Sequence, residues 1–188
     1  MVRFCFLLCL WLTSFYVYSQ ERFLSSRDFT VDSLVLCNAD ERTVSDKWGV
    51  PCRISYGSSP ISTLDGGISD SQLISTMFYY PQCTVSFYTY EVSQWIYMLK
   101  LTGGDMVVSV GRGMDFKVGD SVSVVVDKMR DYITPSVRKR LDSGDGSITF
   151  HTVDDDNIDD CPMTAQITFV MGDSGIVTEI KIGMVKNR

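Results

Sequence analysis

The feature that most constrains the fold is an alternation of apolar and polar residues along several short segments. It is clearest in residues 84–90 and 94–101, and again in 164–171 and 176–183. Successive side chains of a β-strand point to opposite faces, so a period of two predicts strands that bury one face only. Parallel sheets are covered on both faces, whereas antiparallel sheets tolerate an uncovered one. We therefore expect antiparallel sheets with one open face.

Turn and loop signals separate these strands from their neighbours. Thr102–Asp105 has the composition of a hairpin turn. Residues 53–74 are rich in Ser, Gly and Asp and contain Pro60, which predicts a loop. Further strands are predicted at 29–37, 76–80, 105–110 and 147–153.

Short helices are predicted ahead of each group of strands. Residues 40–48 follow a capping pattern and end at Gly49 and Pro51, which favours a short amphipathic helix. In the second half, Asp120 or Ser121 can cap a Val-rich helix, and Thr134–Pro135 begins another through Leu141. The pattern predicts an α+β fold of two tandem units, 20–110 and 111–188, each with short helices on a three- to four-stranded antiparallel sheet. No linker separates the units, so we expect the two sheets to be either continuous or closely packed, as in one domain.

The first nineteen residues have the layout of a cleaved secretory signal. Arg3 gives a positive start, Phe4–Tyr18 is apolar, and Val17 and Ser19 are small enough for a cleavage site. Residues 1–19 are therefore predicted to direct the chain to the periplasm or the outside of the cell. No second apolar run is long enough to span a bilayer, so we expect no stable membrane insertion after cleavage.

The negative net charge of the chain limits which classes of molecule it is expected to bind. The chain carries a formal net charge of −6. An acidic surface disfavours nucleic acid as a partner, because the phosphate backbone is itself negative. The expected partner is an exported or envelope protein.

Four cysteines remain after the signal, namely Cys37, Cys52, Cys83 and Cys161. An even number in an exported chain predicts two disulfides, with three possible connectivities. Four free, buried thiols are the alternative. Direct pairing of Cys37 with Cys52 is disfavoured, because the helix predicted between them spans about 13 Å whereas disulfide Cα atoms lie within about 7 Å.

Four stretches of the chain resemble a known family. They are ERTVSDKWGVPC (41–52), MFYYPQCTVSFYTYEVSQWIYMLKL (77–101), FKVGDSVSVVVDKM (116–129) and ITFVMGDSGIVTEIKI (167–182). They resemble the β-lactamase inhibitor protein family and the related small lipoproteins that support outer-membrane assembly. The resemblance implies tandem helix-plus-sheet units and binding of a target enzyme through the open aromatic face of the sheet. By the same resemblance, Cys52 pairs with Cys83, which leaves Cys37 for Cys161.

Aromatic residues crowd the strands of the first unit. Alternation prevents all of them from entering one core, so Tyr88 and Tyr90 are expected on the face opposite Val85 and Phe87. Exposed Tyr and Trp on a rigid sheet suit a protein interface, while ordinary cross-strand pairing and sugar stacking are the alternatives. The candidate interface residues are Tyr79, Tyr80, Tyr88, Tyr90, Trp95 and Tyr97.

The acidic run at 154–160 is a partial match to a calcium loop. Asp155, Asn157 and Asp159 have the spacing of the first three ligands. However, Asp160 stands where glycine is needed and Gln166 where a closing glutamate is needed. A solvated acidic loop is the alternative, and no other cofactor is predicted.

No motif for catalysis accompanies the single histidine, His151. Its position on a strand is typical of a surface or interface residue. Arg138–Lys139–Arg140 forms a basic patch that either remains solvated or docks an acidic partner. The sequence therefore predicts a non-enzymatic, inhibitor-like or scaffolding protein that acts by protein–protein contact. The alternative is a glycan- or calcium-binding extracellular module.

Overall fold

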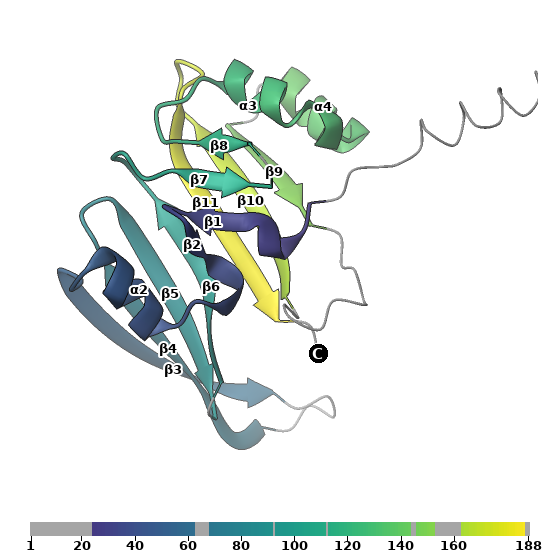
Figure 1. The fold of residues 1–188 in the computed structure, drawn as a ribbon. Coiled ribbons are helices and arrows are strands. Elements are labelled where there is room, and N and C mark those ends of the chain that lie inside the picture. The colour runs from purple at the N-terminus through teal and green to yellow at the C-terminus, as the bar shows by residue number, and fades with distance from the viewer. Residues whose placement is uncertain are drawn as a thin grey trace, which may run out of the picture.

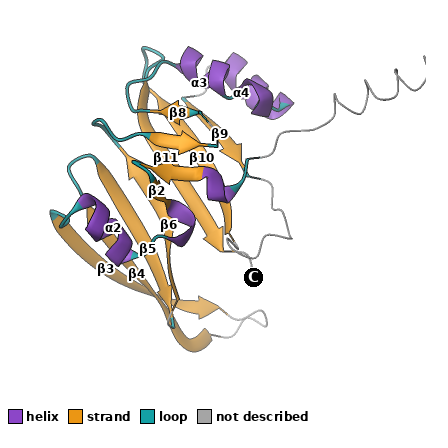
Figure 2. Ribbon diagram, in the orientation of Figure 1, coloured by secondary structure: helices purple, strands orange, loops and turns teal. Residues whose placement is uncertain are grey.

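A computed structural model describes residues 24–62, 68–91, 93–111, 113–143, 146–152 and 163–186. Over these residues the chain forms three α-helices and two antiparallel sheets, so the expected α+β class is confirmed. Strands dominate, as Figure 2 shows. The predicted signal, residues 1–19, lies outside the described residues.

The larger sheet contains seven antiparallel strands in the order β3-β4-β5-β6-β11-β10-β9. Strands β6 and β11 join its two parts, with Leu99 opposite Ile182. This pairing satisfies two edges that would otherwise be exposed. The two expected sheets are therefore joined into one continuous sheet, which is one of the two expected arrangements, and this sheet has seven strands instead of three to four. The strands are β3 (Arg53–Ser62), β4 (Ile68–Tyr79), β5 (Cys83–Tyr90), β6 (Ser93–Leu101), β9 (Ser147–His151), β10 (Met163–Met171) and β11 (Val177–Lys186).

The smaller sheet has four short strands in the order β2-β1-β7-β8. The strand predicted at 29–37 is interrupted, because Asp32 and Ser33 take φ values of 48° and 67° and turn the chain. Two adjacent residues with positive φ are typical of a tight hairpin turn. The strands are β1 (Phe29–Val31), β2 (Leu34–Val35), β7 (Val108–Val110) and β8 (Asp115–Phe116).

The helices are α2 (Glu41–Trp48), α3 (Val122–Lys128) and α4 (Pro135–Ser143), close to their predicted positions. Helix α2 begins where the Asp40 carboxylate accepts a hydrogen bond of 2.7 Å from the Thr43 N–H. It ends at Gly49, whose φ of 82° favours glycine. Ser121 caps α3 in the same way as Asp40 caps α2.

The core lies between the large sheet and the elements that cover one of its faces. Figure 1 shows α2 over β3–β5 and the small sheet over the middle of the large one. Phe116 of the small sheet packs on Phe169 with ring centroids 4.9 Å apart. Beneath α2, Phe78 packs on Phe87 at 5.1 Å. These contacts fix which face of the large sheet is buried.

The prediction of a loop at 53–74 is wrong. Most of this segment forms β3 and β4, which pair from Arg53 opposite Tyr79 to Ser62 opposite Ile68. Pairing of β4 on both sides supplies hydrogen bonds that the local composition does not reveal. Pro60 is tolerated because β3 is an edge strand. Gly57 fits because an added Cβ would approach Ser75 Oγ to 2.7 Å.

Candidate functional site

The candidate site is the face of the large sheet that points away from the core. Along β5, Val85 and Phe87 are fully buried, whereas the alternating Tyr88 and Tyr90 are partly exposed. None of the described helices or strands covers this second face (Figure 1). The placement of Tyr88 and Tyr90 follows the alternation in the sequence. We call this surface the open face.

Three aromatic side chains form one cluster on the open face. Tyr88 and Tyr97 stack with ring centroids 3.7 Å apart and an interplanar angle of 10°. Trp95 and Tyr88 form a T-shaped pair with ring centroids 6.2 Å apart. Burial raises the pKa of Tyr88, and its neighbour Tyr97 adds to the shift. The cluster is a rigid surface in which each ring holds its neighbour in place.

A β-bulge places Tyr97 in this cluster. Ser86 pairs with Met98 and Phe87 pairs with Ile96, so Tyr97 is the extra residue between two pairs. Simple alternation would put Tyr97 on the same face as the buried Leu99. The bulge changes the phase of the strand and brings Tyr97 beside Tyr88.

Tyr79 lies on the open face next to the outer strand β3. Arg53 holds its guanidinium 3.8 Å from the centroid of the Tyr79 ring. Ser55 donates a hydrogen bond of 3.4 Å to the Tyr79 hydroxyl oxygen. This hydrogen bond lowers the pKa of Tyr79, and the positive charge of Arg53 acts in the same direction. Tyr79 therefore presents an aromatic ring paired with a cation.

Tyr80 does not belong to the open face. Its ring forms a T-shaped pair with Trp48 of α2, with ring centroids 6.0 Å apart. Its hydroxyl donates a hydrogen bond of 3.2 Å to the Gly49 carbonyl oxygen. Tyr80 therefore anchors α2 to the covered face, and the aromatic group in the sequence divides between two faces.

An ion-pair network crosses the middle of the open face. Glu179 accepts contacts from Lys100 and from Lys181, the latter at 2.8 Å. Desolvation alone would raise the pKa of Glu179, but hydrogen bonds from the two lysines outweigh it and lower the pKa. With Arg53 nearer the β3 edge, the described open face carries an excess of positive charge on an acidic chain.

The predicted Cys52–Cys83 disulfide is absent, since both are free thiols. Cys52 N–H donates to the Tyr79 carbonyl oxygen, and Tyr80 N–H donates to the Cys83 carbonyl oxygen. The two cysteines therefore flank β4 from opposite sides. Two strand spacings amount to about 9.5 Å, which exceeds the reach of a disulfide.

The other predicted pairing, Cys37–Cys161, stays a prediction. Cys37 is buried and is not one of the free thiols, while Cys161 lies outside the described residues.

The predicted calcium ligands Asp155, Asn157 and Asp159 also lie outside the described residues. Within the described segments, no group of three or more His, Cys, Asp or Glu side chains is placed to hold a metal ion. His151 lies at the end of β9 and is exposed, opposite Gln166.

Two surface features were not predicted from the sequence. Four apolar residues in β3, in β4 and in the segment after α2 are exposed, namely Val50, Ile54, Tyr56 and Ile74. A separate cavity lies beside β9 and is lined partly by Arg140 and His151. The sequence analysis singled out Arg140, as part of the basic patch, and His151 separately. Only the three-dimensional structure shows that these two residues line the same cavity.

No described helix is both long and apolar enough to cross a membrane. Comparisons of the chain with models of known families, with curated proteins and with solved structures find no match. The resemblance to the β-lactamase inhibitor protein family therefore stays a prediction.

Proposed function

We propose that this is an exported, non-enzymatic protein that binds another exported or envelope protein through its open face. It acts by contact, in the manner of an inhibitor or a scaffold. The observation that carries the proposal is the aromatic cluster of Tyr88, Trp95 and Tyr97 on a sheet face that no described element covers.

The chemistry of the open face suits a protein partner. Aromatic residues give large contact areas at low conformational cost, and Tyr, Trp and Arg are enriched among residues that dominate binding energies. The cluster is held rigid by stacking, which reduces the ordering cost of association. Arg53, Lys100 and Lys181 complement acidic groups. The proposed partner surface is therefore apolar with acidic side chains around it.

A pull-down tests the proposal. The purified protein serves as bait for envelope and culture-supernatant proteins of the source organism. A double variant, Tyr88→Ala with Trp95→Ala, removes the cluster. The matched control is Tyr56→Ala, which removes an exposed tyrosine at the β3 edge.

The proposal predicts a protein that the native bait and the Tyr56→Ala control capture and the double variant loses. For that protein, loss of the two aromatic side chains should weaken binding at least tenfold in a direct titration. Capture that is equal for all three baits, or no capture at all, contradicts binding through the open face. Circular dichroism on the double variant establishes that it remains folded.

A further inference from the structure

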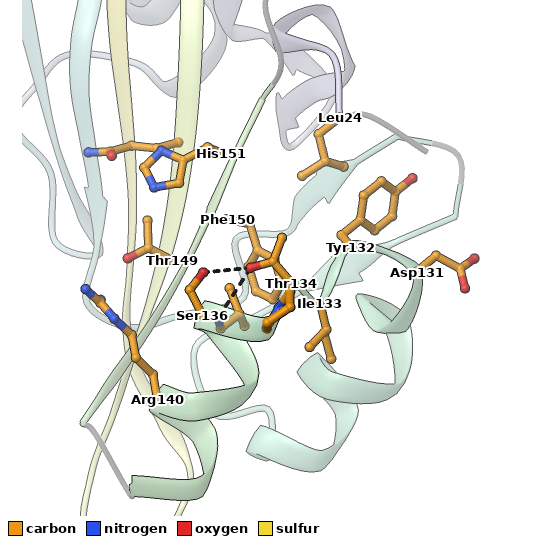
Figure 3. A pocket seen from close by; sticks show the side chains of 13 residues that line it. Leu24, Asp131, Tyr132, Ile133, Thr134, Ser136, Arg140, Thr149, Phe150 and His151 are labelled. Atoms are coloured by element: carbon orange, nitrogen blue, oxygen red, sulfur yellow. Dashed lines mark hydrogen bonds between the residues drawn. The ribbon is translucent and has the colours of Figure 1, made fainter. Parts of the chain in front are cut away.

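A cavity of about 760 Å³ lies beside β9, outside the aromatic cluster. It is bounded by the turn before α4, by the first turns of α4 and by β9 (Figure 3). Pockets of 300–1,000 Å³ typically hold small organic molecules. The cavity therefore has room for a ligand of that class.

One part of the cavity is apolar. Leu24, Val137 and Phe150 line it and are themselves almost fully buried, which holds their positions fixed. Ile133, in the turn before α4, is partly buried and packs against the core. An apolar ligand body would lose its water against these side chains, which favours binding.

Another part of the cavity is lined by side chains that can donate hydrogen bonds. Arg140 of α4, His151 of β9 and Gln166 of β10 line the cavity. Within the described part of the chain, none of these three side chains makes a hydrogen bond or an ion pair. Figure 3 places Arg140 and His151 along the same side as Thr149, while the carboxylate Asp131 lies at the opposite end. His151 and Gln166 are paired and exposed, whereas the adjacent Phe150 is buried, so the two linings lie on opposite sides of β9. The cavity therefore extends around the edge strand β9, with the positive charge on one side and the apolar surface on the other.

We propose that this cavity binds a small amphipathic organic anion, such as a medium-chain carboxylate. The planar guanidinium of Arg140 matches a carboxylate with two parallel hydrogen bonds, and His151 and Gln166 provide further donors. The hydrocarbon part lies against Ile133 and Phe150. This site is independent of the open-face cluster and does not rest on the proposed function.

A titration followed by two-dimensional NMR tests the site, because it detects and locates weak binding. Sodium octanoate is the anionic probe, and 1-octanol is the uncharged probe of equal chain length. The variant Arg140→Gln removes the charge at the cavity. The matched control, Arg138→Gln, removes an exposed charge that lies on the same helix but does not line the cavity.

The proposal predicts shifts on octanoate addition at Ile133, Phe150, His151 and Gln166. It predicts affinity for octanoate about tenfold weaker in Arg140→Gln and unchanged in Arg138→Gln, with octanol binding more weakly than octanoate. Absence of octanoate binding, shifts confined to other regions, or equal losses in the two arginine variants would overturn it.

Discussion

At the scale of single residues, charge and burial decide where a side chain acts. Asp40 begins α2 because its carboxylate accepts from Thr43, and the Thr43 hydrogen bonds lower the pKa of Asp40. Glu179 stays ionised between two lysines on the open face. Each carboxylate acts through the residues that it contacts. Thr43 is three residues from Asp40 in the sequence, whereas Lys100 is far from Glu179 in the sequence. The capping role of Asp40 could therefore be predicted from the sequence, whereas the ion pairs of Glu179 could not.

Glu179 predicts a specific dependence of stability on pH. Its pKa is lowered in the folded state, so its stabilising effect is present above the ordinary Glu pKa of about 4.3. The effect is lost as the pH falls through the lower folded value. Glu179→Gln should therefore cost about 0.5–1 kcal/mol at pH 7, a modest figure because both lysines are partly exposed.

Urea unfolding at several pH values checks this prediction. The difference between the native protein and Glu179→Gln should shrink between about pH 5 and pH 3. Glu91→Gln, at an exposed turn, is the control and should leave stability nearly unchanged. A difference that stays constant or grows towards low pH would contradict the role assigned to Glu179.

The free thiols should differ sharply in reactivity. Burial raises the pKa of Cys83 to about 12, whereas Cys52 is exposed. Because the thiolate is the reactive species, Cys52 should react rapidly with iodoacetamide at pH 8 and Cys83 only after unfolding. Peptide mass mapping assigns the labelled positions. Recovery of Cys52 and Cys83 in one disulfide-linked peptide would refute the free-thiol arrangement.

At the scale of elements, capping residues and hydrophobic periodicity predict the helices and strands whose formation depends on their own sequence. The capped helices and the strands β5, β10 and β11 could be predicted from the sequence, because their hydrophobic periodicity is strong. The β3–β4 hairpin is not, since its serine-rich sequence becomes a strand only through pairing with neighbours. The bulge at Tyr97 depends on register with β5 and is equally hidden from the sequence.

Hydrogen exchange tests whether the hairpin is ordered as described. Amides of β4 should be strongly protected from Thr76 to Tyr79, because β4 is paired on both sides there. Along the edge strand β3, protection should alternate, since every second amide points away from β4. Uniformly rapid exchange across residues 53–62 and 68–79 would restore the original prediction of a loop.

At the scale of the whole molecule, the described helices and strands leave one face of the large sheet uncovered. The helices and the small sheet pack on one side, and the aromatic cluster and the basic residues occupy the other. The positive charge and the aromatic rings of this face, on a chain that is acidic overall, support the proposed binding of an acidic protein surface. The sequence predicted an aromatic face, but it could not separate Tyr80 from the others, because that requires its contact with Trp48.

The most direct test of the account is site-specific photo-crosslinking in cells of the source organism that produce the protein. A benzoylphenylalanine residue replaces Tyr90 on the open face in one variant and Tyr56 at the β3 edge in another. The account predicts a defined crosslinked product from position 90 that Tyr88→Ala removes, with no such product from position 56. Crosslinking from position 56 alone, or products at position 90 that ignore Tyr88→Ala, would contradict binding through the open face.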